Sequence, residues 1–124
     1  MKMPQLKALV KKGESEVLEF KTSTGSLDGA MKTVCAFLNS ETGGTVLIGL
    51  TNDKKIVGQE VTDDVRKKIA AEINKIDPYI KINITEIPVK ADLFVIAFNV
   101  EPGSEAPYSY DSRPFMRNQS TTQR

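Results

Sequence analysis

The sequence predicts a single α+β domain in which a mixed β-sheet packs against two main helices. The chain has 124 residues, which is the size of one domain with one core. Two segments, residues 45–51 and 93–100, are apolar at nearly every position, which is typical of strands covered on both faces. Amphipathic helical segments alternate with these and other strand-like segments, in the expected order α-β-α-β-β-α-β-β-β.

The N-terminal third is expected to form a helix, a strand and a second helix. Residues 4–12 place leucines and a valine at helical spacing, with a proline in the first turn and a glycine after the last. Residues 17–21 alternate as a strand does. Ser26 is the expected cap of the second helix, whose apolar stripe runs over residues 27–38. Gly43 is expected to end this segment because glycine tolerates a positive φ.

The middle of the chain predicts a β-hairpin followed by a third helix. The strand at 45–51 is followed by a polar turn at 52–55 and a short return strand at 56–58. Thr62 is the expected cap of the third helix, which has apolar residues at helical spacing as far as Ile76. Asp77-Pro78 is expected to halt this helix, because the residue before a proline disfavours helical geometry.

The last third predicts strands of decreasing length. Residues 80–85 alternate apolar and polar side chains, which indicates a strand with one wet face. The apolar strand at 93–100 follows, and then a turn-rich loop at 101–105. Residues 106–117 are expected to hold two short edge segments broken by prolines. Residues 118–124 are expected to be a polar tail without a further packing element.

Composition excludes several classes of protein. The sequence contains no histidine, so triads of the Ser-His or Cys-His type and the usual zinc sites are excluded. Cys35 is the only cysteine and falls in the apolar stripe, which indicates a buried thiol in a reducing compartment and hence a cytoplasmic protein. No apolar run approaches the roughly 20 residues of a membrane helix, and the N-terminus lacks a secretory signal, so no membrane partner is expected.

The charge is unevenly distributed although the net charge is only +1. All 16 acidic residues lie between Glu14 and Asp111, whereas residues 1–12 contain four lysines and residues 113–124 contain three arginines. If the two ends meet in the fold, they form a basic patch on an acidic body. The alternative is two ordinary solvated termini.

Basic and hydroxyl side chains near the two ends are the candidate contacts to nucleic-acid phosphates. Arg117 has an alternative role, because it could pair with Glu14 or Glu19 and tie the edge of the sheet to the core. The full set of candidates is Lys7, Lys11, Lys12, Lys21, Arg113, Arg117, Ser120 and Thr121.

Acidic residues around the first strand suggest a second kind of chemistry. A nuclease that uses Mg²⁺ or Mn²⁺ needs carboxylates that converge on the ion, beside a cation that meets the phosphate. Glu14, Glu19 and Lys21 are the candidate catalytic residues of such an enzyme, and Asp53 joins the two glutamates as a candidate metal ligand. The alternative is that Glu14, Glu16 and Glu19 form surface ion pairs, which contribute little stability.

Four segments carry a resemblance to a known family. They are Glu14-Ser15-Glu16-Val17-Leu18-Glu19-Phe20-Lys21, Cys35-Ala36-Phe37-Leu38-Asn39, Gly43-Gly44-Thr45-Val46-Leu47-Ile48-Gly49-Leu50 and Phe115-Met116-Arg117-Asn118-Gln119-Ser120-Thr121. The order of these segments and their amino-acid sequences resemble those of the Schlafen AlbA-like domain. The resemblance covers about residues 13–123. It implies a DNA-binding domain of the kind found in bacterial transcriptional regulators, here as an N-terminal part of a longer protein.

The resemblance also implies where a ribonuclease site would lie. Schlafen-type ribonucleases use a glutamate pair with the spacing of Glu14 and Glu19, and a third acid in a Gly-Val-Asp-Asp sequence. The matching positions here are Gly49-Leu50-Thr51-Asn52, so both acids of that sequence are missing. The favoured interpretation is therefore a nucleic-acid-binding domain for DNA or RNA. The alternatives are a metal-dependent endoribonuclease with a degenerate acidic site and a domain that mainly mediates homo-oligomerisation.

Overall fold

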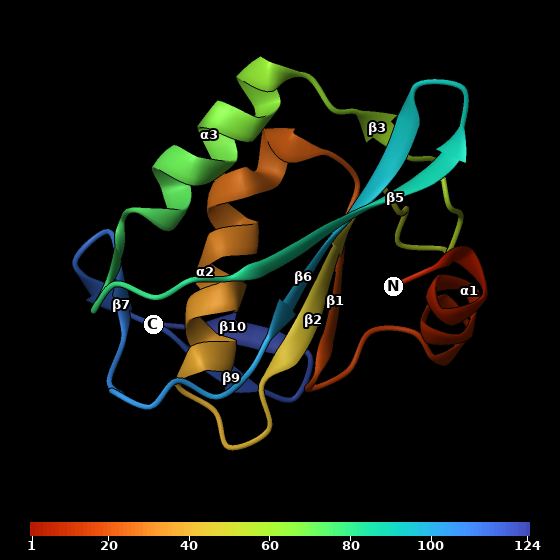
Figure 1. Ribbon diagram of the computed structural model, residues 1–124. Coiled ribbons are helices and arrows are strands. Elements are labelled where there is room, and N and C mark those ends of the chain that lie inside the picture. Colours follow the sequence, from red (N-terminus) through yellow and green to blue (C-terminus); the bar gives the residue numbers. More distant parts are fainter.

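The computed structural model describes residues 1–124 and has three layers (Figure 1). A five-stranded sheet lies in the middle. Helices α2 (Leu27–Leu38) and α3 (Asp63–Ile73) cover one face of the sheet, and helix α1 (Met3–Lys12) covers the other. The predicted α+β class, with a mixed sheet against two main helices, is confirmed.

The sheet consists of β1 (Leu18–Lys21), β2 (Gly44–Ile48), β3 (Gln59–Glu60), β5 (Asn83–Lys90) and β6 (Leu93–Val100). Strand β2 is parallel to β1 and antiparallel to β6, and β6 pairs with β3 and β5 as well. Both apolar segments are therefore central strands, as predicted. Strand β2 ends at Ile48 because Gly49 adopts a φ of 115° and turns the chain out of the sheet.

Each face of the sheet has its own core because side chains alternate along the strands. On one face Val46 and Phe98 belong to a cluster of 19 buried residues that includes the inner side of α2. On the other face Leu47 and Ala97 pack with Leu6 of α1 in a cluster of nine. Helix α1 is short, so it covers only part of this second face.

Helix α2 forms from the predicted apolar stripe, and its thiol is buried as predicted. Cys35 has no exposed surface, and burial raises the pKa of its thiol to about 11. The predicted cap is wrong, because Ser26 makes no capping hydrogen bond. Ser23 accepts a hydrogen bond from the Gly25 amide and caps a short 3₁₀ turn, Thr24–Ser26, that leads into α2.

The predicted hairpin at residues 45–58 forms only in part. After β2 the chain makes the predicted turn, but its return is limited to an antiparallel bridge between Leu50 and Ile56 and a few backbone hydrogen bonds, including Thr51 N–H to the Lys55 carbonyl oxygen at 2.9 Å. Strand β3 then pairs with β6, with Gln59 opposite Phe94, rather than with β2. Strand β3 pairs with β6 because β6 extends past the end of β2 and has unpaired backbone groups along that edge.

Two further boundaries differ from the prediction. Helix α3 is capped by Thr62 as predicted but ends at Ile73, and Ile76 reaches the core from a short strand, β4 (Ile76–Asp77). The strand predicted at 80–85 is shifted, because β5 begins at Asn83 and continues through Pro88. A proline is tolerated there because β5 lies at the edge of the sheet.

The C-terminal segment forms short strands outside the main sheet. They are β7 (Ser109–Tyr110), β8 (Arg113–Pro114), β9 (Met116–Asn118) and β10 (Thr121–Gln123). Strands β9 and β10 form a hairpin that packs on α2, so the end of the chain is not the polar tail that the sequence predicts. None of the helices is long enough and apolar enough to span a membrane.

Asn39 joins the end of α2 to the C-terminal segment. Its side-chain amide nitrogen donates to the carbonyl oxygens of Tyr108 at 2.9 Å and of Phe115 at 3.0 Å. Its amide oxygen accepts from the Tyr108 backbone N–H at 2.6 Å. One side chain thus satisfies three backbone groups of a segment that has few hydrogen bonds of its own.

We expect Asn39→Ala to lower the free energy of unfolding by about 2–3 kcal/mol, because it leaves these backbone groups without partners. Urea denaturation of the two proteins measures the difference. Asn74→Ala is the matched control, since Asn74 is exposed at the end of α3, and we expect a change within about 0.5 kcal/mol. Equal effects of the two substitutions would contradict this role of Asn39.

Candidate nucleic-acid interface

Four exposed lysines lie along α1 and on the turn beside its C-terminal end. Lys7 and Lys11 are one helical turn apart and so share a face of α1, and Lys12 follows in the last turn. Lys54, from the turn at 51–55, extends its amino group to the Lys11 carbonyl oxygen at 3.2 Å. We call Lys7, Lys11, Lys12 and Lys54 the lysine cluster.

Local structure explains why Lys54 joins this group. The last carbonyl groups of a helix lack intrahelical partners and carry partial negative charge, so a lysine amino group is favoured there. The turn that carries Lys54 is held by the hydroxyl of Thr51, which donates to Asp53 and accepts from the Lys55 amide. Helix α1 itself contains no acidic residue, so its charge is not neutralised within the helix.

Sequence reasoning missed Lys54 because it lies 43 residues from Lys11 along the chain. The only local signal was the pair Lys54-Lys55 in a turn next to the first long strand. Lys55 differs from Lys54, because its amino group lies 3.8 Å from the Asp53 carboxylate.

The predicted contacts from the C-terminal end lie on the other side of the sheet. Strands β9 and β10 pack on α2, whereas α1 packs on the opposite face, so the two basic ends do not join into one patch. Arg113 is exposed beside a hollow that Asp28, Glu72 and Asp111 also line. Ser120 and Thr121 are exposed at the β9–β10 turn.

Arg117 lies inside the protein, with 1% of its side chain exposed. One terminal nitrogen, Nη1, donates to the Glu19 carboxylate at 2.8 Å, and Nη2 donates to the Ser15 carbonyl oxygen at 2.7 Å. The guanidinium also lies over the Phe37 ring, 5.3 Å from its centroid. These contacts occupy the guanidinium within the fold, so it joins the C-terminal hairpin to β1 and α2.

Glu19 is the acidic partner in this buried network. Its second carboxylate oxygen accepts from the Thr33 hydroxyl at 2.8 Å and lies 3.3 Å from the Lys21 amino group. Burial alone raises the pKa of Glu19, but the hydrogen bonds from Arg117 and Thr33 and the nearby cations outweigh it and hold the pKa below its usual range. Lys21 is therefore half-buried beside Glu19 rather than free at the surface.

A comparison with family models identifies the domain. The model described as "Schlafen, AlbA_2" matches residues 14–124. The chain belongs to the Schlafen AlbA_2 family. The match includes β2 and also β1, α2 and the C-terminal hairpin, which Arg117 and Glu19 join. It begins after α1, so three members of the lysine cluster precede the matched residues.

The fold of this Schlafen AlbA_2 domain is found in other solved structures. One of them is the crystal structure of the DIP2311 protein from Corynebacterium diphtheriae, with a TM-score of 0.66 and 17% sequence identity. The alignment covers 97% of this chain and 30% of the other, so the chain spans less than a third of the length of that protein. No curated protein matches the chain.

The acidic residues of this Schlafen AlbA_2 domain do not gather at one point. Glu14 accepts a hydrogen bond from the Phe20 backbone N–H at 2.9 Å, along the edge of β1. Asp53 is part of the turn that carries Lys54. No group of three or more histidine, cysteine, aspartate or glutamate side chains is placed to hold a metal ion.

The carboxylate oxygens of these residues are also poorly suited to bind Mg²⁺ or Mn²⁺. Such ions prefer several oxygen ligands that are free to coordinate. Both oxygens of Glu19 already accept hydrogen bonds, and two cationic side chains flank the carboxylate. Glu14, Glu19 and Asp53 thus do not fit a common metal site, and we derive no reaction step through one.

Proposed function

We propose that this domain binds nucleic acid by placing the lysine cluster against backbone phosphates, as the nucleic-acid-binding domain of a bacterial transcriptional regulator in the cytoplasm. The observation that carries the proposal is the set of four exposed lysines on α1 and the adjacent turn, with the Lys54 amino group bound to the Lys11 carbonyl oxygen. Membership of the Schlafen AlbA_2 family supports nucleic-acid binding in general. The specific role as a regulator rests on the resemblance described above.

The arrangement of the cluster suits phosphates rather than bases. Lysine is a compact point charge with rotatable donors, which contacts phosphate without reading sequence. The side chain of Lys54 is held at the helix end by its hydrogen bond, whereas the three lysine side chains of α1 are exposed. The proposal therefore predicts binding that depends on charge and little on base sequence.

A salt titration tests the proposal. About four phosphate contacts correspond to a slope of about −3 to −4 in a plot of log K against log salt on duplex DNA. Fluorescence anisotropy between about 50 and about 200 mM salt, with duplex DNA, the matching single strand and tRNA, measures this slope. Binding that is absent, or that does not change with salt, would contradict the proposal.

The same samples separate binding from cleavage. Each is incubated with EDTA or with Mn²⁺, and the nucleic acid is then run on a denaturing gel. Because the acids do not converge, we expect intact nucleic acid in both. Cleavage of tRNA in Mn²⁺ that is abolished by Glu19→Gln, in a variant shown to be folded, would favour the ribonuclease alternative instead.

A further inference from the structure

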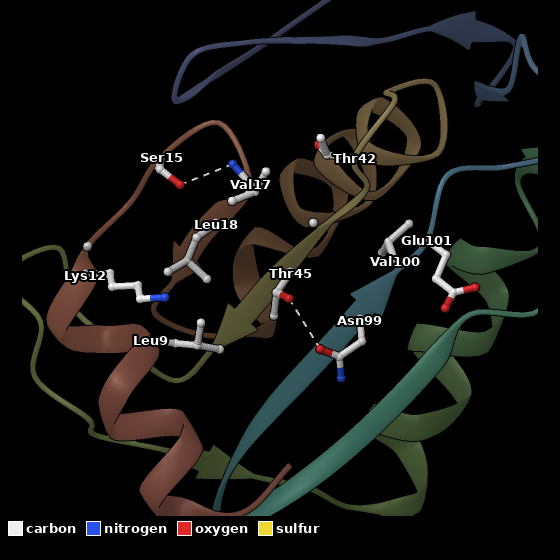
Figure 2. A pocket seen from close by; sticks show the side chains of 12 residues that line it. Leu9, Lys12, Ser15, Val17, Leu18, Thr42, Thr45, Asn99, Val100 and Glu101 are labelled. Carbon is white, nitrogen blue, oxygen red and sulfur yellow. Dashed lines mark hydrogen bonds between the residues drawn. The ribbon is translucent and has the colours of Figure 1, made fainter.

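An open pocket of about 490 Å³ lies beside the C-terminal end of α1, on the face of the sheet that α1 only partly covers (Figure 2). Its volume falls in the range of roughly 300–1,000 Å³ that is typical of small-molecule sites. Leu9 and Lys12 of α1 line one side, and Thr45 and Asn99 form part of the floor.

The pocket floor and the part of the sheet under α1 belong to the same face of the sheet. The part under α1 is apolar, whereas the pocket floor is polar. Leu47 and Ala97 are opposite each other in β2 and β6 and are buried under α1. Thr45 and Asn99 are the next opposed pair on that face, two residues further along each strand. The shortness of α1 leaves this pair partly exposed, and an uncovered polar pair is suited to contact a ligand.

The polar pair has a defined orientation. The Thr45 hydroxyl donates to the side-chain oxygen of Asn99 at 3.3 Å. Figure 2 shows the amide nitrogen of Asn99 on the side away from Thr45. This leaves the two N–H donors of the amide nitrogen and one oxygen lone pair without a protein partner. Such an amide can pair with a base edge that places a donor beside an acceptor, as adenine, cytosine and thymine each do, so any preference for an amino group must come from a neighbouring acceptor.

The two ends of the pocket carry opposite charges. The Lys12 amino group extends into it from α1, and the Glu101 carboxylate lies on the other side, just after β6 (Figure 2). Apolar side chains, including Leu9 and Leu18, line the space between them. A ligand that fits this arrangement has an anionic end, an apolar ring and an amino group at the far end.

We propose that this pocket receives one unstacked nucleotide whose exocyclic amino group lies beside a ring-nitrogen acceptor, adenine or cytosine, from a single strand held by the lysine cluster. The phosphate lies against Lys12, which belongs to both the cluster and the pocket. The ring lies against the apolar wall, and its amino edge meets Asn99 and Glu101. The proposal rests on the proposed function, because the cluster must bring the strand to the pocket.

The first experiment compares oligomers of dA, dC and dT on the wild type and on Asn99→Leu, which removes the amide at similar volume. We expect the substitution to weaken binding of dA and dC about 10-fold and to leave dT binding and every salt slope unchanged. Glu101→Gln should act in the same direction with a smaller loss. Asn74→Leu and Glu60→Gln are the matched controls on exposed sites outside the pocket, with no base-dependent effect.

The second experiment observes the pocket directly by ¹⁵N–¹H NMR spectroscopy. Adenosine monophosphate should shift the side-chain amide of Asn99 and the backbone amides of Gly44 and Thr45, whereas ribose 5-phosphate should not. Shifts confined to the lysine cluster, or equal losses on all three oligomers, would overturn the pocket and leave salt-dependent binding intact. A wild type that binds no oligomer at any salt would overturn both the pocket and the proposed function.

Discussion

Replacing Arg117 with methionine is expected to lower the free energy of unfolding by about 3–5 kcal/mol, because it leaves the Glu19 carboxylate buried without its main partner. Only 11% of the Glu19 side chain is exposed, so water cannot replace the lost guanidinium. The carbonyl oxygens of Ser15 and Leu18 lose donors at the same time. Urea denaturation followed by circular dichroism measures the change.

Two controls separate the charge effect from the loss of packing. Arg113→Met removes an exposed arginine near the same hairpin, and we expect a change within about 0.5 kcal/mol. The double variant Glu19→Leu/Arg117→Met removes both members of the buried pair and leaves only the half-buried Lys21 without its carboxylate partner, so it should recover a large part of the lost stability. A double variant as unstable as Arg117→Met would contradict the electrostatic explanation.

The network also predicts a change in pH dependence. The folded pKa of Glu19 lies below its ordinary value of 4.5, so its contribution to stability is present above that value and is lost as the pH falls through the folded pKa. Without Arg117 the desolvation of Glu19 is less well opposed, which raises the folded pKa. The loss of stability on acidification should therefore be smaller in Arg117→Met than in the wild type, and unfolding midpoints between about pH 3 and about pH 7 measure it.

The triple variant Lys7→Gln/Lys11→Gln/Lys54→Gln is expected to weaken binding to duplex DNA about 100-fold or more near 0.1 M salt. Each lysine that contacts a phosphate releases a counterion, so the loss of three contacts should flatten the log–log salt slope by about 2–3. Anisotropy titrations at several salt concentrations give both quantities from one data set. The unfolding midpoint should change little, because all three side chains are exposed.

The matched control removes the same number of lysines from the other side of the molecule. Lys67, Lys68 and Lys81 are exposed on and beside α3, across the sheet from α1. Their replacement by glutamine lowers the net charge equally, so only long-range effects should remain, within about threefold in affinity. Equal losses in the two triple variants would show that net charge alone, rather than the lysine cluster, attracts nucleic acid.

Several features follow from the sequence alone because they depend on neighbours along the chain. The unbroken apolar character of β2 and β6 predicts central strands, and the spacing of apolar residues in α2 places Cys35 in the core. The lysines of α1 are exposed because Leu6 and Val10 occupy its buried face. The sequence allowed two roles for Arg117, pairing with Glu19 or contacting a phosphate. The residue type alone does not distinguish between them.

Only the tertiary structure decided which distant residues meet. Lys54 reaches the end of α1 because the turn after β2 returns beside it, and Arg117 is buried because the C-terminal hairpin packs on α2. Thr45 and Asn99 form a pocket floor only because β2 and β6 pair in that register beyond the end of α1. The periodicity of a helix or strand predicts which of its faces is buried. Which other element packs against that face depends on how all the elements together bury their apolar surface.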